Sequence, residues 1–238
     1  LGRPQVDRLK ADLSFAQNTG QVWKFVMIPE PMQNLGVLGA SDRYEGYAAE
    51  RSEILSYIKN NNIQNVVFVS ADIHGTLVNN LTYQNGPGQA QIPSGAWEIT
   101  TGSVAFDAPF GQTVAGLAAG LGLLTPAQFA FYNTLPRVNK DAFIEGLVNN
   151  QLAQLGYDPL GLQGSEIPAT LLSASYHAMH TFGWTDFQVD ALTQELTVTT
   201  YGVDPYTAAQ LDANPSLITS LNPEIVSQFR VAAIPTPA

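Results

Sequence analysis

A carboxylate and an imidazole, two side chains that bind metal ions in many proteins, stand two residues apart after an apolar run. The run is Val66–Ser70, and Asp72 and His74 follow it. Successive side chains of a strand point to opposite faces, so a continuing strand would direct Asp72 and His74 to the same side. Carboxylate oxygen and imidazole nitrogen suit zinc, iron or manganese. Gly75 comes directly after them, and it is expected to allow a sharp turn and to leave room for a ligand to approach.

The position of the pair supports a binding site. Ligands of open α/β sheets bind beyond the carboxyl ends of the strands. The run Val66–Ser70 shows no alternation of apolar and polar residues, which predicts a strand buried on both faces. The simpler alternative is that Asp72 caps a helix and His74 is a satisfied buried side chain, and the short motif alone does not decide between the two.

Arg51 is a second candidate. Residues 34–46 are expected to form a loop and residues 44–59 a helix whose apolar positions share one face, and Arg51 falls on that face. A guanidinium among core side chains requires a partner, so Arg51 is expected to pair with a carboxylate or reach a polar pocket. The alternative is that its side chain extends to solvent or pairs with a nearby Glu.

Several segments match a known pattern in the right order. The chain starts Leu-Gly-Arg-Pro-Gln, and an apolar segment follows at 22–27. Residues 42–51 begin Asp-Arg-Tyr-Glu-Gly-Tyr and end at Arg51, and residues 65–74 end Ser-Ala-Asp-Ile-His. Together these segments resemble the PhoD-like alkaline phosphatase D family of calcineurin-like metallophosphatases, in which the last segment usually ends Gly-Asp-x-His. Ala71 replaces that glycine, and the resemblance is faint beyond residue 110.

The resemblance implies a fold, a reaction and a set of site residues. The fold would be of the α/β (α+β) class, a layered β-sandwich flanked by helices. The reaction would be phosphoester hydrolysis of the alkaline phosphatase or phosphodiesterase type, with a metal-activated hydroxide attacking phosphorus. Asp72 and His74 would bind metal, Asp42 would lie near a second ion, and Arg51 would brace that loop or stabilise charge. The metal ions implied are iron and calcium, with zinc or manganese as alternatives, and a phosphate ester is the substrate.

The same resemblance implies a division of the chain. The family's first ligand motifs would precede residue 1, so the chain is expected to be the C-terminal portion of a single metallophosphatase domain, with the N-terminal half as a possible separate partner chain. Residues 1–110 would form the core half, 111–183 a helical insertion, 184–204 a closing hairpin and 205–238 a tail. The alternative is a non-catalytic extracellular binding or structural protein on this scaffold, whose helical region binds a partner.

Periodicity and turn residues predict further elements. Helices are expected at 4–18, 125–135, 141–155 and 223–230, with Asp141 as the N-cap of the third, and strands at 22–28, 77–83, 97–101, 184–190 and 196–203. His177 and His180 precede the last two strands as a His-x-x-His pair. His180 is expected either to bind metal or to orient a loop, whereas His177 is expected to be exposed.

Composition excludes several classes of function. The net charge of −10 and the absence of a Lys/Arg cluster argue against nucleic-acid binding. The chain has no cysteine, so it has neither disulfides nor thiolate ligands. Ser103 is not within a Gly-x-Ser-x-Gly motif, which leaves serine hydrolysis unsupported. Only 13% of residues are charged and no apolar stretch reaches membrane-spanning length, which favours an extracytoplasmic (periplasmic, secreted or cell-surface) protein without a transmembrane segment.

Overall fold

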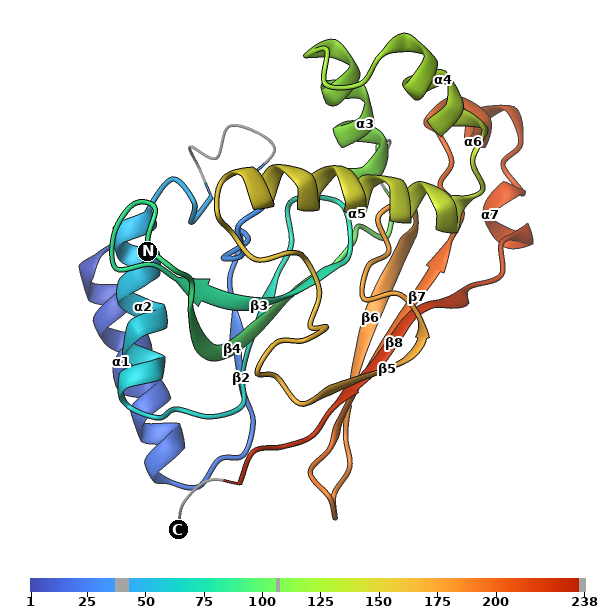
Figure 1. Ribbon diagram of the computed structural model, residues 1–238. Helices are drawn as coiled ribbons and strands as arrows, with labels where there is room; N and C mark the ends of the chain where they lie inside the picture. Colours follow the sequence, from blue (N-terminus) through green and yellow to red (C-terminus); the bar gives the residue numbers. More distant parts are fainter. Residues whose placement is uncertain (37–42, 106–107, 236–238) are drawn as a thin grey trace.

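The computed structural model describes residues 1–36, 43–105 and 108–235 (Figure 1). Its helices are α1 (Arg3–Asn18), α2 (Ala48–Asn60), α3 (Phe110–Gly120), α4 (Pro126–Thr134), α5 (Arg137–Gln154), α6 (Ala208–Ala213) and α7 (Leu217–Ser220). Its strands are β1 (Lys24–Met27), β2 (Val66–Ser70), β3 (Leu77–Tyr83), β4 (Ile92–Thr100), β5 (Ala169–Ala174), β6 (Phe182–Val189), β7 (Leu196–Val203) and β8 (Glu224–Val231). They form two sheets, ordered β1-β2-β4-β3 and β5-β8-β7-β6. The expected mixed α/β class is therefore confirmed.

The first sheet is mostly parallel. β1, β2 and β4 run in the same direction, and β3 runs antiparallel to β4. The three parallel carboxyl ends therefore meet at one edge, which faces α5 in Figure 1. Every residue of β2 is buried, as the lack of alternation predicted. Phe68 contributes to the core under α1 and α2, whereas Val67 and Val69 contribute to the core between the two sheets.

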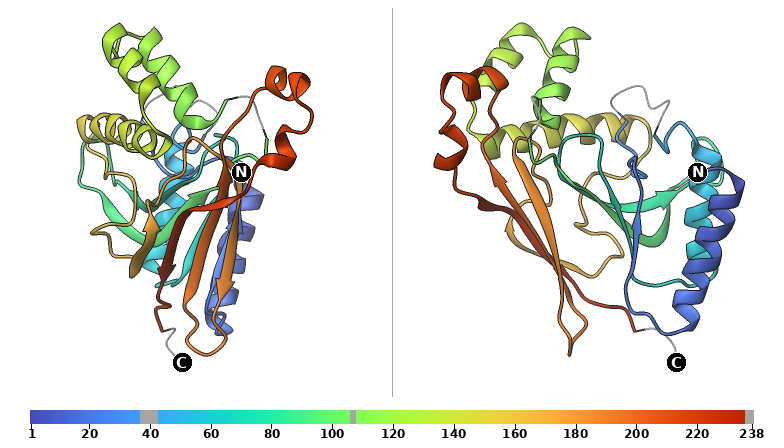
Figure 2. Two further views of the ribbon diagram at one scale, coloured as in Figure 1. Left: turned by 90° about the vertical axis from the view of Figure 1, so that its right-hand side faces the viewer. Right: turned by 180° about the vertical axis from the view of Figure 1, so that it is seen from behind.

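Helices α1 and α2 cover one face of the first sheet, and the second sheet lies on the other side (Figure 2). Both helices were predicted, each with apolar residues on one face. The core beneath them includes Val6 and Leu13 from α1, Ile54, Leu55 and Ile58 from α2, and Val66, Phe68, Leu81 and Ala96 from the sheet.

The second sheet is antiparallel throughout, and its inner face packs on the first sheet. Trp97 and Phe229 meet edge to face in this core, with ring centroids 5.6 Å apart. The predicted hairpin is confirmed as β6 and β7, but two other predictions were wrong. The segment 223–230 forms β8 instead of a helix, because Ser227, Phe229 and Val231 alternate toward the core. Within the segment predicted to be helical, Ala169–Ala174 forms β5, paired with β8.

Helices α3, α4 and α5 form a third core with the edge of the first sheet (Figure 1). The core includes Leu77, Phe110, Val114, Tyr132, Ile144, Val148 and Met179. Helix α5 starts at Arg137, four residues before the predicted start, with Pro136 as its N-cap. The prediction of Asp141 as N-cap was therefore wrong, because the fixed φ of proline suits the entry to a helix. None of the helices in the described ranges has the length and apolar character needed to cross a membrane.

Candidate functional site

The loop 71–76, between β2 and β3, carries the two predicted metal ligands. β2 ends at Ser70, and both Asp72 and His74 have left-handed backbone, with φ values of 71° and 59°. The strand alternation that was expected to align the two side chains is therefore absent, and the loop conformation positions them instead. A non-glycine residue in this conformation costs on the order of 1–3 kcal/mol, and such residues concentrate at functional sites.

Hydrogen bonds from neighbouring segments hold this loop. The Thr100 hydroxyl at the end of β4 donates to the carbonyl of Gly75 at 2.7 Å. Thr76 and Ala178 exchange two backbone hydrogen bonds of 3.0 and 2.9 Å. The loop is thereby fixed to β4 on one side and to the chain before β6 on the other, which limits the freedom of Asp72 and His74.

Gly75 is required for close packing in this loop. A Cβ at this position would lie 2.6 Å from the Cβ of Phe110, the first residue of α3. The Phe110 amide also donates to the carbonyl of His74 at 3.0 Å. The space beside Gly75 that was expected to admit a ligand therefore holds Phe110, and α3 supports the loop directly.

The loop presents suitable metal donors, but few of them. Asp72 is exposed and His74 is half-buried. Within residues 1–36, 43–105 and 108–235, no three His, Cys, Asp or Glu side chains form a group that could hold a metal ion. Zinc takes about four ligands and calcium roughly six to eight. The chemistry of Asp72 and His74 thus fits a metal site, and a complete site requires further donors.

Of the two predicted catalytic residues, the structure describes only Arg51. Asp42 lies outside the described residues. Arg51 lies in the first turn of α2 and is only 5% exposed, and its Nε donates to the carbonyl of Met32 at 2.6 Å. Burial lowers the pKa of Arg51 to about 10, so the guanidinium stays charged at neutral pH. This arrangement supports an interior, bracing position and argues against extension to solvent.

The sequence prediction missed Glu98, which lies in β4 and is completely buried. Its carboxylate accepts hydrogen bonds from the amide of Met32, at 2.8 and 3.1 Å, and from the amide of Gln33, at 2.7 Å. Burial raises the pKa of Glu98, while the two amides and the charge of Arg51 act in the opposite direction. Glu98 and Arg51 therefore hold the segment after β1 from two sides. The sequence did contain a signal for Glu98, because a carboxylate between Trp97 and Ile99 in an apolar strand requires buried hydrogen-bond partners.

His180 is buried and has a partner on each ring nitrogen. Nδ1 lies 2.6 Å from Oδ1 of Asp141 on α5, and Nε2 lies 2.6 Å from the hydroxyl of Tyr132 on α4. Asp141 also accepts a hydrogen bond from the amide of Met179 at 2.9 Å. With both nitrogens engaged inside the protein, the arrangement favours the loop-orienting role of His180 over the metal-ligand role.

Gly111 gives a direct test of this arrangement. A Cβ there would lie 2.1–2.7 Å from atoms of the His180 ring, so Gly111→Ala is expected to displace the imidazole and lower the free energy of unfolding by about 1–3 kcal/mol. Gly116 lies in the same helix with no atom near its Cβ position. Gly116→Ala, the matched control, is expected to stabilise the protein by about 0.5–1 kcal/mol. Urea unfolding measures the change in the free energy of unfolding for each variant. Equal changes in the two variants would contradict the prediction.

His177 is buried, at 2% exposure, so the prediction of an exposed side chain was wrong. Its Nδ1 accepts a hydrogen bond from the amide of Val78 at 3.3 Å. Its Nε2 lies 3.9 Å from Oε1 of Glu145, one turn after Asp141 on α5. Burial lowers the pKa of His177 to about 4. Histidine occurs both at the surface and in the interior of proteins, and the sequence around His177 did not indicate which position this side chain takes.

The low pKa of His177 predicts acid sensitivity. Between pH 6.5, the ordinary value, and pH 4, the unfolded state binds a proton that the folded state does not, so stability falls as the pH falls through this range. The loss amounts to about 3 kcal/mol at the acid end. His177→Gln should remove this loss, as measured by urea unfolding at several pH values. Burial and Asp141 raise the pKa of Glu145, which acts in the opposite sense, so Glu145→Gln is the control. An unchanged pH dependence in His177→Gln would refute the prediction.

Comparison with known proteins gives a family match for the first half of the chain. A family model described as PhoD-like phosphatase matches residues 1–134. A solved structure of PhoD matches with 21% identity over 43% of this chain, at a TM-score of 0.34. This chain covers 20% of the length of that solved chain. No curated protein matches the sequence.

Proposed function

This chain belongs to the PhoD-like phosphatase family, and from that premise we propose that it is part of a metal-dependent phosphoester hydrolase. The observation that carries the proposal is the loop 71–76. It holds a carboxylate and an imidazole at the carboxyl end of a parallel strand, with left-handed backbone at both residues. Sites of α/β sheets lie at such ends.

Asp72 and His74 are the residues that would hold metal. The chemistry that bound cations supply in such sites is activation of water and neutralisation of phosphoryl charge. The protein's own part is to hold the two donors in a fixed relation, through the bonds from Thr100 and Ala178 to their loop. Asp42 would add a carboxylate from the segment before α2, and the remaining donors would come from outside this chain. Iron and calcium are the ions we propose, in an extracytoplasmic protein.

Arg51 has a positioning role in this proposal. Its Nε and the Glu98 carboxylate both bind the backbone of Met32, in the segment that continues toward Asn34. Their common effect is to fix the path of the chain after β1. Arg51 thus acts on the site through the backbone that it orders.

The test compares this chain alone with the complete protein. Metal content is measured by elemental analysis, and hydrolysis with 4-nitrophenyl phosphate and bis(4-nitrophenyl) phosphate, which separate monoester from diester cleavage. We expect bound metal and hydrolysis in the complete protein, and weak or no hydrolysis by residues 1–238 alone. Absence of both metal and hydrolysis from the complete protein would overturn the proposal.

A binding role on the same scaffold is the second candidate. The tips of α3 and α4 and the start of α5 expose apolar side chains, namely Leu117, Leu121, Leu123, Phe131 and Val138. In Figure 1, α3 and α4 extend away from the sheets, whereas α5 lies across their edge. Surfaces of this kind commonly mark protein contacts. The assay above separates the two functions, because a binding module would show neither metal nor turnover in the complete protein.

A further inference from the structure

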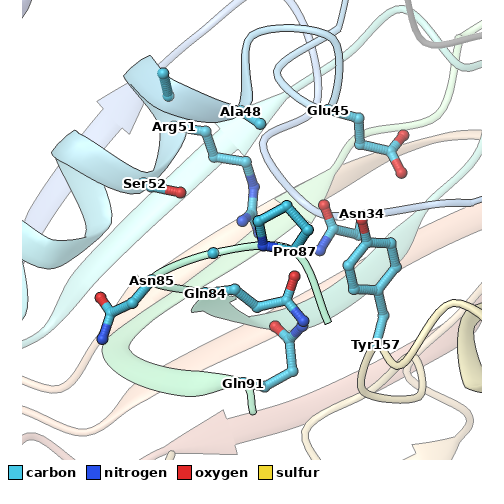
Figure 3. A pocket seen from close by; sticks show the side chains of 12 residues that line it. Asn34, Glu45, Ala48, Arg51, Ser52, Gln84, Asn85, Pro87, Gln91 and Tyr157 are labelled. Carbon is cyan, nitrogen blue, oxygen red and sulfur yellow. The ribbon is translucent and has the colours of Figure 1, made fainter. Parts of the chain in front are cut away.

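A pocket with several polar side chains in its lining lies between the start of α2, the β3–β4 turn and the chain after α5. Its volume is about 460 Å³, and none of its lining residues belongs to the loop 71–76. Figure 3 shows the guanidinium of Arg51 and the carboxamides of Asn34, Gln84 and Gln91 directed into it, with the ring of Tyr157 at one side. Pockets of roughly 300–1,000 Å³ hold small molecules.

Arg51 is the only described lining residue with a positive charge. Its Nε binds the carbonyl of Met32, and within the described part of the chain this is the sole hydrogen bond of the side chain. Neither terminal nitrogen has a hydrogen-bond partner or a carboxylate within ion-pair distance among those residues. Arg51, which is 5% exposed as a residue, therefore directs two donors toward the pocket, and no acceptor among the described residues takes them.

The two carboxylates near Arg51, those of Glu45 and Glu98, bind other groups of the protein. Oε1 of Glu45 accepts hydrogen bonds from the amides of Leu35 and Gly36, at 2.8 and 2.9 Å. Oε2 of Glu45 lies 3.4 Å from Nη2 of Arg43, in an ion pair. Glu98 binds the backbone after β1, as described above. The charges of these two carboxylates favour the charged form of Arg51. Glu45 also lines the pocket, so a ligand with one negative charge meets less repulsion there than a ligand with two.

The remaining polar groups are neutral. The carboxamide of Asn34 is buried, makes no hydrogen bond to the described residues, and lines the pocket. Gln84 uses its Nε2 on the carbonyl of Gln89, which leaves its carbonyl oxygen as an acceptor. A carboxamide has both donors and an acceptor, so it can donate a hydrogen bond to a hydroxyl group or accept one from it. A planar guanidinium matches the two oxygens of a carboxylate.

We propose that this pocket binds a singly charged carboxylate carried by a small hydroxyl-bearing molecule. The carboxylate pairs with the terminal nitrogens of Arg51, and the hydroxyl groups bind the carboxamides of Asn34 and Gln84. The site is separate from the proposed metal loop, and its occupancy does not depend on hydrolysis.

The test uses three probes that separate charge from hydroxyl binding. Sodium gluconate has both groups, sorbitol has the hydroxyl groups without the charge, and inorganic phosphate has charge without the hydroxyl-bearing body. Each is titrated into ¹⁵N-labelled protein at constant ionic strength and pH 7, and the side-chain amide signals of Asn34, Gln84 and Gln91 are followed. We expect saturable shifts with gluconate and at least about tenfold weaker binding of sorbitol and phosphate, because a hydrogen bond to a charged group contributes about 1.5–3 kcal/mol. Equal binding of sorbitol, tighter binding of phosphate, or no saturation with gluconate would each overturn the proposal.

Variants then assign the binding to the pocket. Arg51→Met should weaken gluconate binding at least about tenfold. Lys59→Met, which removes a positive charge from the exposed last turn of the same helix, is the matched control and should leave binding unchanged. Asn34→Leu, which keeps Arg51 in place, covers the case in which Arg51→Met does not fold, and it should weaken binding severalfold. Gluconate affinity that is unaffected in Asn34→Leu, or equally reduced in Lys59→Met, would refute the assignment.

Discussion

Replacement of Asp72 by alanine in the complete protein is expected to lower the rate of phosphoester hydrolysis by about 1000-fold. Loss of a ligand removes charge stabilisation of several kcal/mol from the transition state, and about 4 kcal/mol corresponds to this factor. Because Asp72 is exposed and its loop is held by backbone bonds from other segments, the fold should persist. The measurement is the rate of 4-nitrophenyl phosphate hydrolysis together with the metal content of the same sample.

Asp212→Ala, at an exposed position of α6, is the control for loss of a carboxylate from the surface. It should leave both the rate and the metal content unchanged. An Asp72→Ala protein that retained its metal and its rate would remove Asp72 from the ligand set, and the proposed site would lose its main support.

Replacement of Glu98 by leucine is expected to lower the free energy of unfolding by about 3–5 kcal/mol, because two buried backbone amides lose the carboxylate that accepts their hydrogen bonds. Two backbone amides, those of Met32 and Gln33, would lose their acceptor, and the buried guanidinium of Arg51 would lose its nearby negative charge. Each unsatisfied amide costs about 1–3 kcal/mol. Urea unfolding followed by circular dichroism measures the change.

Two further variants separate these causes. Glu98→Gln keeps an acceptor oxygen and should cost less than Glu98→Leu. The double variant Glu98→Leu, Arg51→Met should be more stable than the sum of the two single changes predicts, because it leaves no isolated charge. Strict additivity of the two single changes would show that Arg51 and Glu98 do not interact.

The elements of the first half could be predicted because each has a local signal. The run Val66–Ser70 has no polar residue before its last position, and the helix containing Arg51 has its apolar residues on one face. In the second half, strands β5 and β8 depend on each other, because each is completed by pairing across the sheet. The short segments Ala169–Ala174 and Glu224–Val231 mix apolar and polar residues, and their patterns do not distinguish strand from helix without that pairing.

In the candidate site, too, the features with a local sequence signal could be predicted, and those that depend on contacts with distant segments could not. The positions of Asp72 and His74 at the end of a buried strand followed from the sequence, but their left-handed backbone did not, since it depends on contacts with Thr100, Phe110 and Ala178. The partners of His180 could not be predicted either. Tyr132 and Asp141 lie on the consecutive helices α4 and α5, and only tertiary packing brings His180 to them from a distant part of the sequence.

In the proposed metal site, the left-handed backbone at residues 72 and 74 lowers thermal stability while it positions the two donor side chains. Glycine adopts positive φ without a steric penalty, so it should relieve the strain at either position while removing a donor atom. Random libraries screened for heat resistance alone would then accumulate glycine at these two positions. Libraries screened for turnover would retain aspartate and histidine, and accept the lower melting temperature that comes with them.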